Sequence, residues 1–146
     1  MILVDTGPLV ALCDPRDAQH AAAVKHLVRL APERLGVCEA VLMEACFHLP
    51  YRSQRERLRA VLDELHIEAV PTSAPDFLTD VFRWLLKYAD HEPDWADGCL
   101  AVLCGRTDRV KVWSYDREFR TTWRRLDGKG IPMAVRHSRI LCTTRE

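Results

Sequence analysis

Four acidic residues interrupt apolar stretches of this 146-residue chain, and carboxylates at such positions could bind a metal ion. Asp5 ends the apolar run that opens the chain, and Asp116 ends a second such run. Glu44 and Asp97 lie within apolar stretches of helical spacing. Acids forced together repel one another, which raises some of their pKa values unless a cation neutralises them. Oxygen ligands alone suit Mg²⁺ or Mn²⁺, so these acids predict a hard-cation site if the fold collects them.

A cation held in this way could activate a water molecule while it neutralises charge on a scissile phosphate. We expect Asp5 and Asp97 to bind the metal directly. Glu44 and Asp116 are expected to hold waters or a second ion, because Mg²⁺ keeps several of its waters. Asp94 lies three residues before Asp97, on nearly the same face of a predicted helix. The predicted catalytic residues are Asp5, Glu44, Asp97 and Asp116.

Each of these acids also has a purely structural interpretation. Asp5 could cap the helix that starts near Pro8. Asp94 and Asp97 could be favourable charges in a first helical turn, and Asp116 could belong to an ordinary turn. The triplet at residues 5–7 is also found in aspartic proteases, but those are all-β dimers with paired carboxylates. The four acids in this order favour the metal site over these separate interpretations.

The elements that must position the acids alternate between strands and helices, which predicts an α/β fold with a parallel sheet between helices. Functional groups gather beyond the carboxyl ends of such strands, so Asp5 and Asp116 should meet at one edge. Ser53 with Glu56 is a capping-box pattern, and Ser73 is the predicted cap of the following helix. The expected strands are at 2–5, 36–38, 67–70, 110–115 and 133–135; the expected helices are at 7–13, 18–31, about 41–49, 53–65, about 73–89, 94–106 and 117–125.

Composition and charge narrow the class of protein. Neither a linker nor a repeat divides the chain, so residues 1–146 are predicted to be a single domain. The six cysteines form no C-x-x-C pair, which gives poor support to zinc or thioredoxin chemistry. The opening apolar run is too short for a signal peptide, and no stretch approaches the roughly 18–20 residues of a membrane span. We therefore expect a soluble, cytoplasmic protein without a membrane association.

Basic residues are concentrated in the last third of the chain, although the chain carries 21 basic and 21 acidic side chains in total. Zero net charge argues against a strongly basic nucleic-acid coat but not against a local basic groove. A basic flank beyond Asp116 would hold phosphates of single-stranded or loop RNA, and a solvated helix face is the alternative. The predicted RNA-binding residues are Arg117, Arg120 and Arg124, within a cluster that also contains Arg106, Arg109, Lys111 and Arg125.

With these residues in place, the chain resembles the PIN-domain ribonucleases of the VapC type, which are found in bacterial toxin–antitoxin pairs. The first motif is similar to residues 4–12 around Asp5, and the second to residues 41–45 around Glu44. The third is similar to residues 94–101 and the fourth to residues 114–119. Cys38 and Gly98 depart from the pattern, in which Ser or Thr and Ala are usual at these two places.

The resemblance implies a PIN-like α/β/α sandwich, a divalent-metal site and endoribonuclease activity. It also implies a homodimer and a cognate antitoxin that blocks the site. Within the third motif it makes Asp97 the main acid and Asp94 an accessory ligand. A fold does not guarantee chemistry, so a catalytically inert PIN-fold module that binds RNA or protein is the alternative.

Overall fold

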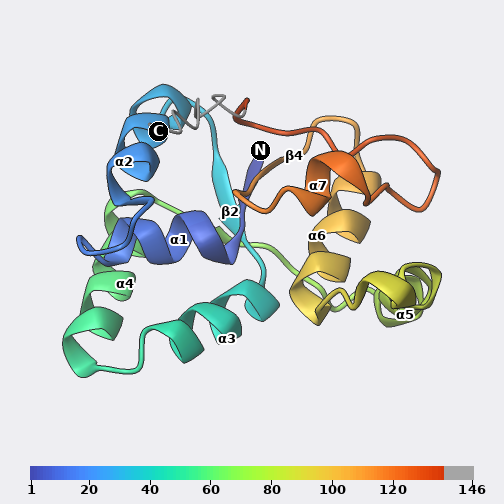
Figure 1. Ribbon diagram of the computed structural model, residues 1–146, viewed down its shortest axis with the longest axis horizontal. Coiled ribbons are helices and arrows are strands. Elements are labelled where there is room, and N and C mark those ends of the chain that lie inside the picture. Colours follow the sequence, from blue (N-terminus) through green and yellow to red (C-terminus); the bar gives the residue numbers. More distant parts are fainter. Residues whose placement is uncertain (137–146) are drawn as a thin grey trace, which may run out of the picture.

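The computed structural model describes residues 1–136, and in this part of the chain one parallel sheet is covered by helices on both faces (Figure 1). Its strands are β1 (Ile2–Val4), β2 (Leu35–Val37), β3 (Glu68–Ala69) and β4 (Lys111–Trp113). Their order across the sheet is β3-β2-β1-β4, and every neighbouring pair is parallel. The predicted α/β fold class is confirmed.

Apart from α3, the helices before β3 and the helices after it lie on opposite sides of the sheet (Figure 1). On one side, α1 (Thr6–Cys13) packs against α2 (His20–Leu30) and α4 (Arg52–Glu64). On the other side, α5 (Phe77–Lys87) packs against α6 (Trp95–Gly105). The short helix η1 (Ala89–His91) connects these two, and α7 (Glu118–Thr121) follows β4. Helix α3 (Glu39–His48) contacts both α1 and α6, so it links the two groups.

The connection order places a switch point between β1 and β4. The chain adds β2 and then β3 on one side of β1, and returns to add β4 on the other side. Val4 lies opposite Trp113 in the register, and the Asp5 N–H continues the pairing by donating to the Trp113 carbonyl at 3.0 Å. Ligand sites in open α/β sheets form where the strand order reverses in this way. Asp5 and the residues after Trp113 therefore arrive together at that crevice.

Tight packing between α5 and α6 fixes the second group of helices and explains one departure from the expected motif. A β-carbon on Gly98 would approach Val81 Cγ1 to 3.0 Å and Trp84 Cε3 to 3.3 Å. Trp84 is fully buried, and its indole N–H donates to the Arg124 carbonyl at 2.8 Å. A side chain at position 98 would therefore have to push α6 away from a well-anchored tryptophan.

Several predicted element boundaries are wrong. The predicted helix 117–125 is limited to α7, because the chain then turns back and Arg124 forms an isolated antiparallel bridge with Gly130. The predicted strand at 133–135 is only a single bridge between Met133 and Val112. Helix α4 is capped by Tyr51 with Gln54 rather than by Ser53 with Glu56, whose carboxylate instead accepts from Arg52. Helix α5 begins at Phe77, with Asp76 rather than Ser73 at its N-cap.

Two further findings concern the chain as a whole. Within residues 1–136, no helix combines the length and the apolar character that a membrane crossing requires. Cys13, Cys38, Cys99 and Cys104 are buried and Cys46 is half-buried, all as free thiols. Cys142 lies outside the described residues.

Candidate active site

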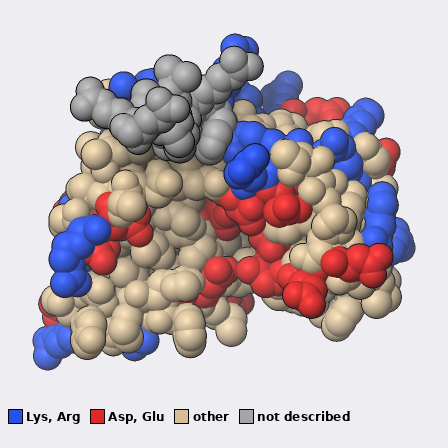
Figure 2. Space-filling view, in the orientation of Figure 1, with Lys and Arg blue, Asp and Glu red and all other residues tan. Residues whose placement is uncertain are grey.

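A cavity of about 310 Å³ opens beyond the carboxyl ends of β1 and β4, and acidic side chains line most of it. Figure 2 shows acidic side chains gathered in the middle of one face, with basic side chains along their upper border and around the outer parts of that face. Among the described residues, no lysine or arginine lines the cavity. The lining residues are Asp5, Thr6, Gly7, Val10, Asp17, Glu44, His48, Asp94, Asp97 and Asp116.

Asp5 lies at the base of this cavity and is held by two hydrogen bonds. The Thr6 backbone N–H donates to Oδ1 at 2.7 Å, and the Ser114 hydroxyl donates to Oδ2 at 2.6 Å. Asp5 is therefore also the N-cap of α1, as its structural interpretation required. Only 8% of the residue is exposed, and burial raises the pKa of its carboxyl to about 6 although both hydrogen bonds oppose the rise.

Asp94 and Asp97 face each other at the start of α6. The Asp97 N–H donates to Asp94 Oδ1 at 2.8 Å, and the Asp94 N–H donates to Asp97 Oδ2 at 3.0 Å. This reciprocal pair is a capping box in which an aspartate replaces the usual glutamate. Burial raises the pKa of Asp97 to about 9, and the negative charges of Asp94, Asp5 and Asp116 add to the effect.

Glu44 reaches the cavity from the middle of α3. Its Oε2 accepts a hydrogen bond from the Thr6 hydroxyl at 3.1 Å, and its Oε1 lies 3.8 Å from His48 Nε2. Burial and the nearby Asp94 charge raise the pKa of Glu44, against the opposing influence of Thr6 and His48. Thr6 thus couples the helix that follows Asp5 to the helix that carries Glu44.

Asp116 completes the acidic lining from the turn after β4. Its Oδ1 accepts from the Glu118 N–H at 2.9 Å, and its own N–H donates to Ser114 Oγ at 3.0 Å. Because the Ser114 hydroxyl also donates to Asp5, a single buried serine fixes the position of two cavity acids. The structure therefore brings together all five predicted site acids, and each has a local structural partner as well.

Sequence reasoning missed four residues that shape this cavity, one of which is the acid Asp17. Thr6 and Ser114 lie inside the quoted motifs, but no role was predicted for their hydroxyls. His48 was not singled out, although its position four residues after Glu44 places it on the same face of α3. The spacing could have identified His48, whereas the Ser114–Asp5 contact joins residues 109 positions apart and leaves no local signal.

The donor set suits a hard divalent cation. All of the acidic ligands offered to the cavity are carboxylate oxygens, which Mg²⁺ and Mn²⁺ prefer. Within residues 1–136, however, no three His, Cys, Asp or Glu side chains already form a compact metal cage. A cation that keeps several waters does not need one, because one or two carboxylates suffice to hold it. The residues therefore fit a partly hydrated ion in a cavity of this size.

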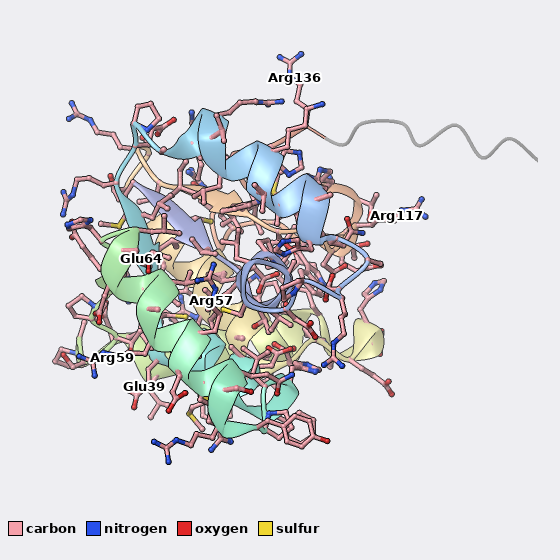
Figure 3. All side chains as sticks on the ribbon, turned by 90° about the vertical axis from the view of Figure 1, so that its left-hand side faces the viewer. Glu39, Arg57, Arg59, Glu64, Arg117 and Arg136 are labelled. Carbon is pink, nitrogen blue, oxygen red and sulfur yellow. The ribbon has the colours of Figure 1, made fainter. Side chains whose placement is uncertain are left out.

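The three arginines predicted to bind RNA differ in their surroundings. Arg117 is exposed and points into solvent (Figure 3), and no acid pairs with it among the described residues. Arg120 donates to the Val135 carbonyl at 3.0 Å, and Arg124 donates to the Trp123 carbonyl at 2.9 Å. Of the three, Arg117 is thus the one best placed to meet a phosphate.

Comparisons with known proteins agree with this architecture. The sequence profile of the PIN domain matches residues 2–123. Among solved structures, the chain is similar to the VapC20 toxin of Mycobacterium tuberculosis, described as cleaving the sarcin–ricin loop, with a TM-score of 0.67 and 21% identity. The match covers 81% of this chain and 92% of that one. A comparison with curated protein sequences gives no match.

Proposed function

This chain belongs to the PIN-domain family, and we propose that it is an endoribonuclease that uses a divalent cation and acts as the toxin of a toxin–antitoxin pair. The observation that carries the proposal is the cavity at the switch point, where Asp5, Glu44, Asp94, Asp97 and Asp116 converge. Similarity to a toxin described as cleaving the sarcin–ricin loop supports RNA as the substrate.

In the proposed mechanism, Asp5 and Asp97 would hold the cation, which we propose to be Mg²⁺ or Mn²⁺, and Asp94, Glu44 and Asp116 would be accessory or water-mediated ligands. A bound cation would neutralise charge on the scissile phosphate and lower the pKa of a water molecule. The Ser114 hydroxyl and the Thr6 N–H orient Asp5, so that its carboxylate is already held in position at the cavity. Glu44 and Asp116 position the water that attacks phosphorus in line with the leaving oxygen.

Beyond Asp116, Arg117 would bind a phosphate of the substrate, with smaller contributions from Arg120 and Arg124, whose guanidinium groups already donate to backbone carbonyls. The proposed protein is a single domain over residues 1–146 and works in the cytoplasm, where its RNA substrate would be. A cognate antitoxin would block the acidic cavity.

A homodimer is the proposed assembly, and one face of α5 supports it. Leu78, Phe82 and Leu86 recur at intervals of four residues and are exposed, so they form an apolar stripe along that helix. Contiguous exposed apolar surface of this kind is typical of protein interfaces. Leu86→Asp should therefore shift the protein towards the monomer in sedimentation velocity, and an unchanged assembly would contradict this interface.

The direct test of the function uses purified protein and a hairpin RNA that contains a sarcin–ricin loop. We expect cleavage with Mg²⁺ or Mn²⁺, loss of cleavage with EDTA, and loss of cleavage in Asp5→Ala. A wild-type rate for Asp5→Ala would reject the mechanism. Because other RNAs could be the target, total RNA from a bacterial cell is the second substrate, and no metal-dependent cleavage of either RNA would reject the activity.

The alternative function is an inert PIN-fold module that binds RNA or protein. One observation favours it: Asp5, Asp94 and Asp97 all cap helices, so their presence also has a structural reason. Metal binding distinguishes the two functions, because acids that serve only as helix caps need no cation. A protein that binds RNA but shows no calorimetric signal with Mn²⁺ would favour the inert module.

A further inference from the structure

An apolar pocket of about 490 Å³ lies beside the acidic cavity, between α3 and the start of α6. Met43 and Phe47 line it from α3, and Trp95 with Ala96 lines it from α6. Its remaining lining residues are Ala40, Glu44, His48 and Asp94. The pocket thus has aromatic side chains contributed by two separate helices, with polar groups along the border that it shares with the cavity.

The apolar side chains of this pocket are unusually exposed for their size. Phe47 is 81% exposed and Met43 is 69% exposed, although large apolar residues are normally buried. Trp95 is also exposed, but its ring is braced by Phe82 in an edge-to-face contact with ring centres 5.2 Å apart. Among the aromatic rings of residues 1–136, Phe47 contacts only that of His48, with ring centres 5.6 Å apart. Trp95 is therefore a fixed platform, and Phe47 has room to adjust to a ligand.

Continuity with the acidic cavity indicates what part of a ligand enters this pocket. Glu44, His48 and Asp94 line both spaces, so a molecule bound at the acids extends into the apolar pocket without crossing a barrier. A phosphate is unsuited to it, because two of the shared lining residues are acids. A flat, uncharged aromatic group suits it, because such a group stacks on aromatic side chains whatever its substituents are.

We propose that this pocket binds a nucleobase of the RNA next to the scissile phosphate, stacked between Phe47 and Trp95. The proposal rests on the proposed ribonuclease function and gives its substrate a property: an unpaired base that can leave its stack. RNA loops and single strands offer such bases, whereas a paired base in a duplex does not. His48 lies at the boundary between the two spaces, where the sugar that joins the base to the phosphate would pass.

The test is the binding of a fluorescent eight-nucleotide oligoadenylate, compared with the same backbone carrying abasic residues. Ca²⁺ replaces Mg²⁺ to slow cleavage, and a gel confirms that the RNA stays intact. We expect Phe47→Ala to weaken binding of oligoadenylate about 10-fold and to leave binding of the abasic strand unchanged, since stacking on one aromatic residue contributes about that much. Phe47→Trp should bind oligoadenylate as the wild type does.

Val28→Ala is the matched control, because Val28 on α2 is another exposed apolar residue that lines neither the pocket nor the α5 stripe. It should leave RNA binding unchanged. The proposal would be overturned if Phe47→Ala weakened binding of oligoadenylate and of the abasic strand equally, or left oligoadenylate binding unchanged. It would also be overturned if the wild type bound no RNA. A shift of Phe47→Ala towards the monomer in sedimentation velocity would overturn it as well, because the pocket would then be covered by a second copy.

The outcomes for the pocket and for the enzymatic activity are separable. Base-dependent binding that is lost in Phe47→Ala, in a protein that never cleaves RNA, would uphold the pocket and reject the ribonuclease. Metal-dependent cleavage with unchanged oligoadenylate binding by Phe47→Ala would reject only the pocket.

Discussion

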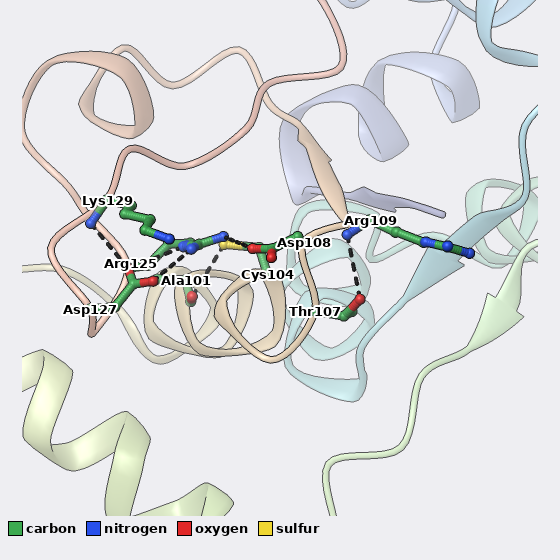
Figure 4. Close-up of polar contacts among 8 residues, drawn as sticks. All are labelled: Ala101, Cys104, Thr107, Asp108, Arg109, Arg125, Asp127 and Lys129. Atoms are coloured by element: carbon green, nitrogen blue, oxygen red, sulfur yellow. Dashed lines mark hydrogen bonds and ion pairs between the residues drawn. The ribbon is translucent and has the colours of Figure 1, made fainter.

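Two regions of this protein bury charged side chains, and they treat those charges in opposite ways. At the carboxyl edge of the sheet, the acidic cavity collects several carboxylates, and no lysine or arginine among the described residues lines it. In the turn after α7, Arg125 lies between Asp127 of the same turn and Asp108 of the loop that leads into β4 (Figure 4), a group that we call the Arg125 cluster. Only 4% of Arg125 is exposed, so it is as deeply buried as Asp5 and Asp97.

The charges of the Arg125 cluster compensate one another. Asp127 accepts from Nη2 at 2.6 Å and from Nε at 3.2 Å, and Asp108 accepts from Nη1 at 3.1 Å. These contacts raise the pKa of Arg125, and they lower the pKa of Asp127 to about 2. In the acidic cavity, burial moves the pKa values of Asp5 and Asp97 upwards instead. The charges of the Arg125 cluster are therefore balanced within the protein, whereas the acidic cavity has a negative charge that a cation would balance.

The largest effect expected from this difference concerns cleavage. Asp97→Asn should lower the rate of RNA cleavage by at least about 100-fold, because even residues that only support metal ligands contribute 10- to 100-fold. Asp127→Asn makes the same chemical change in the Arg125 cluster and should leave the rate unchanged. Single-turnover cleavage of the same hairpin RNA measures both. Equal rates for the two variants would remove the functional distinction between the regions.

The second effect concerns the free energy of unfolding, to which the Arg125 cluster should contribute more than an exposed arginine does. Arg125→Ala should lower the free energy of unfolding by about 2–3 kcal/mol, because it removes a buried side chain and several hydrogen bonds to charged partners. Arg117→Ala is the control, and its exposed side chain should change stability by less than about 0.5 kcal/mol. Urea unfolding followed by circular dichroism gives both values. A loss as small as that of Arg117→Ala would show that the Arg125 cluster does little for the fold.

The smallest effect has opposite signs in the two regions. In metal-free buffer at neutral pH, Asp97→Asn should raise the free energy of unfolding by about 1–2 kcal/mol, since it removes a buried acid that its neighbours repel. The amide oxygen can still accept from the Asp94 N–H, so the cap is kept. Asp127→Asn should lower stability, because it weakens the paired contacts of Arg125. Destabilisation by both variants would mean that the cavity acids are ordinary structural groups.

Patterns along the chain were enough to predict the α/β class and five of the six acids that line the cavity, Asp17 being the exception. Asp5 and Asp116 each follow a short apolar run, and parallel strands deliver such residues to the same edge. The extent of elements was harder to predict, because tertiary contacts decide it. The predicted helix 117–125 ends early. Arg125 instead lies in a turn, where it pairs with Asp127 of that turn and with Asp108, 17 residues earlier in the chain.

The basic stretch shows a second limit of sequence reasoning. Arg106 and Arg125 belong to the cluster predicted to flank the RNA, but Arg106 pairs with Asp76 and Asp80. Arg125 is buried among its own acidic partners. A count of charges along the sequence does not tell which of them are neutralised by residues far away. For the same reason, the Ser114 contact that holds Asp5 could not be foreseen.

The central claim is that the acidic cavity is incomplete without a divalent cation, and calorimetric titration with Mn²⁺ tests it most directly. We expect the wild-type protein to bind Mn²⁺ and to melt at a higher temperature when the ion is bound, because a ligand of the folded state stabilises it. Asp97→Asn should lose this binding, and Arg117→Ala should keep it. No binding by the wild type, or equal binding by Asp97→Asn, would contradict the claim.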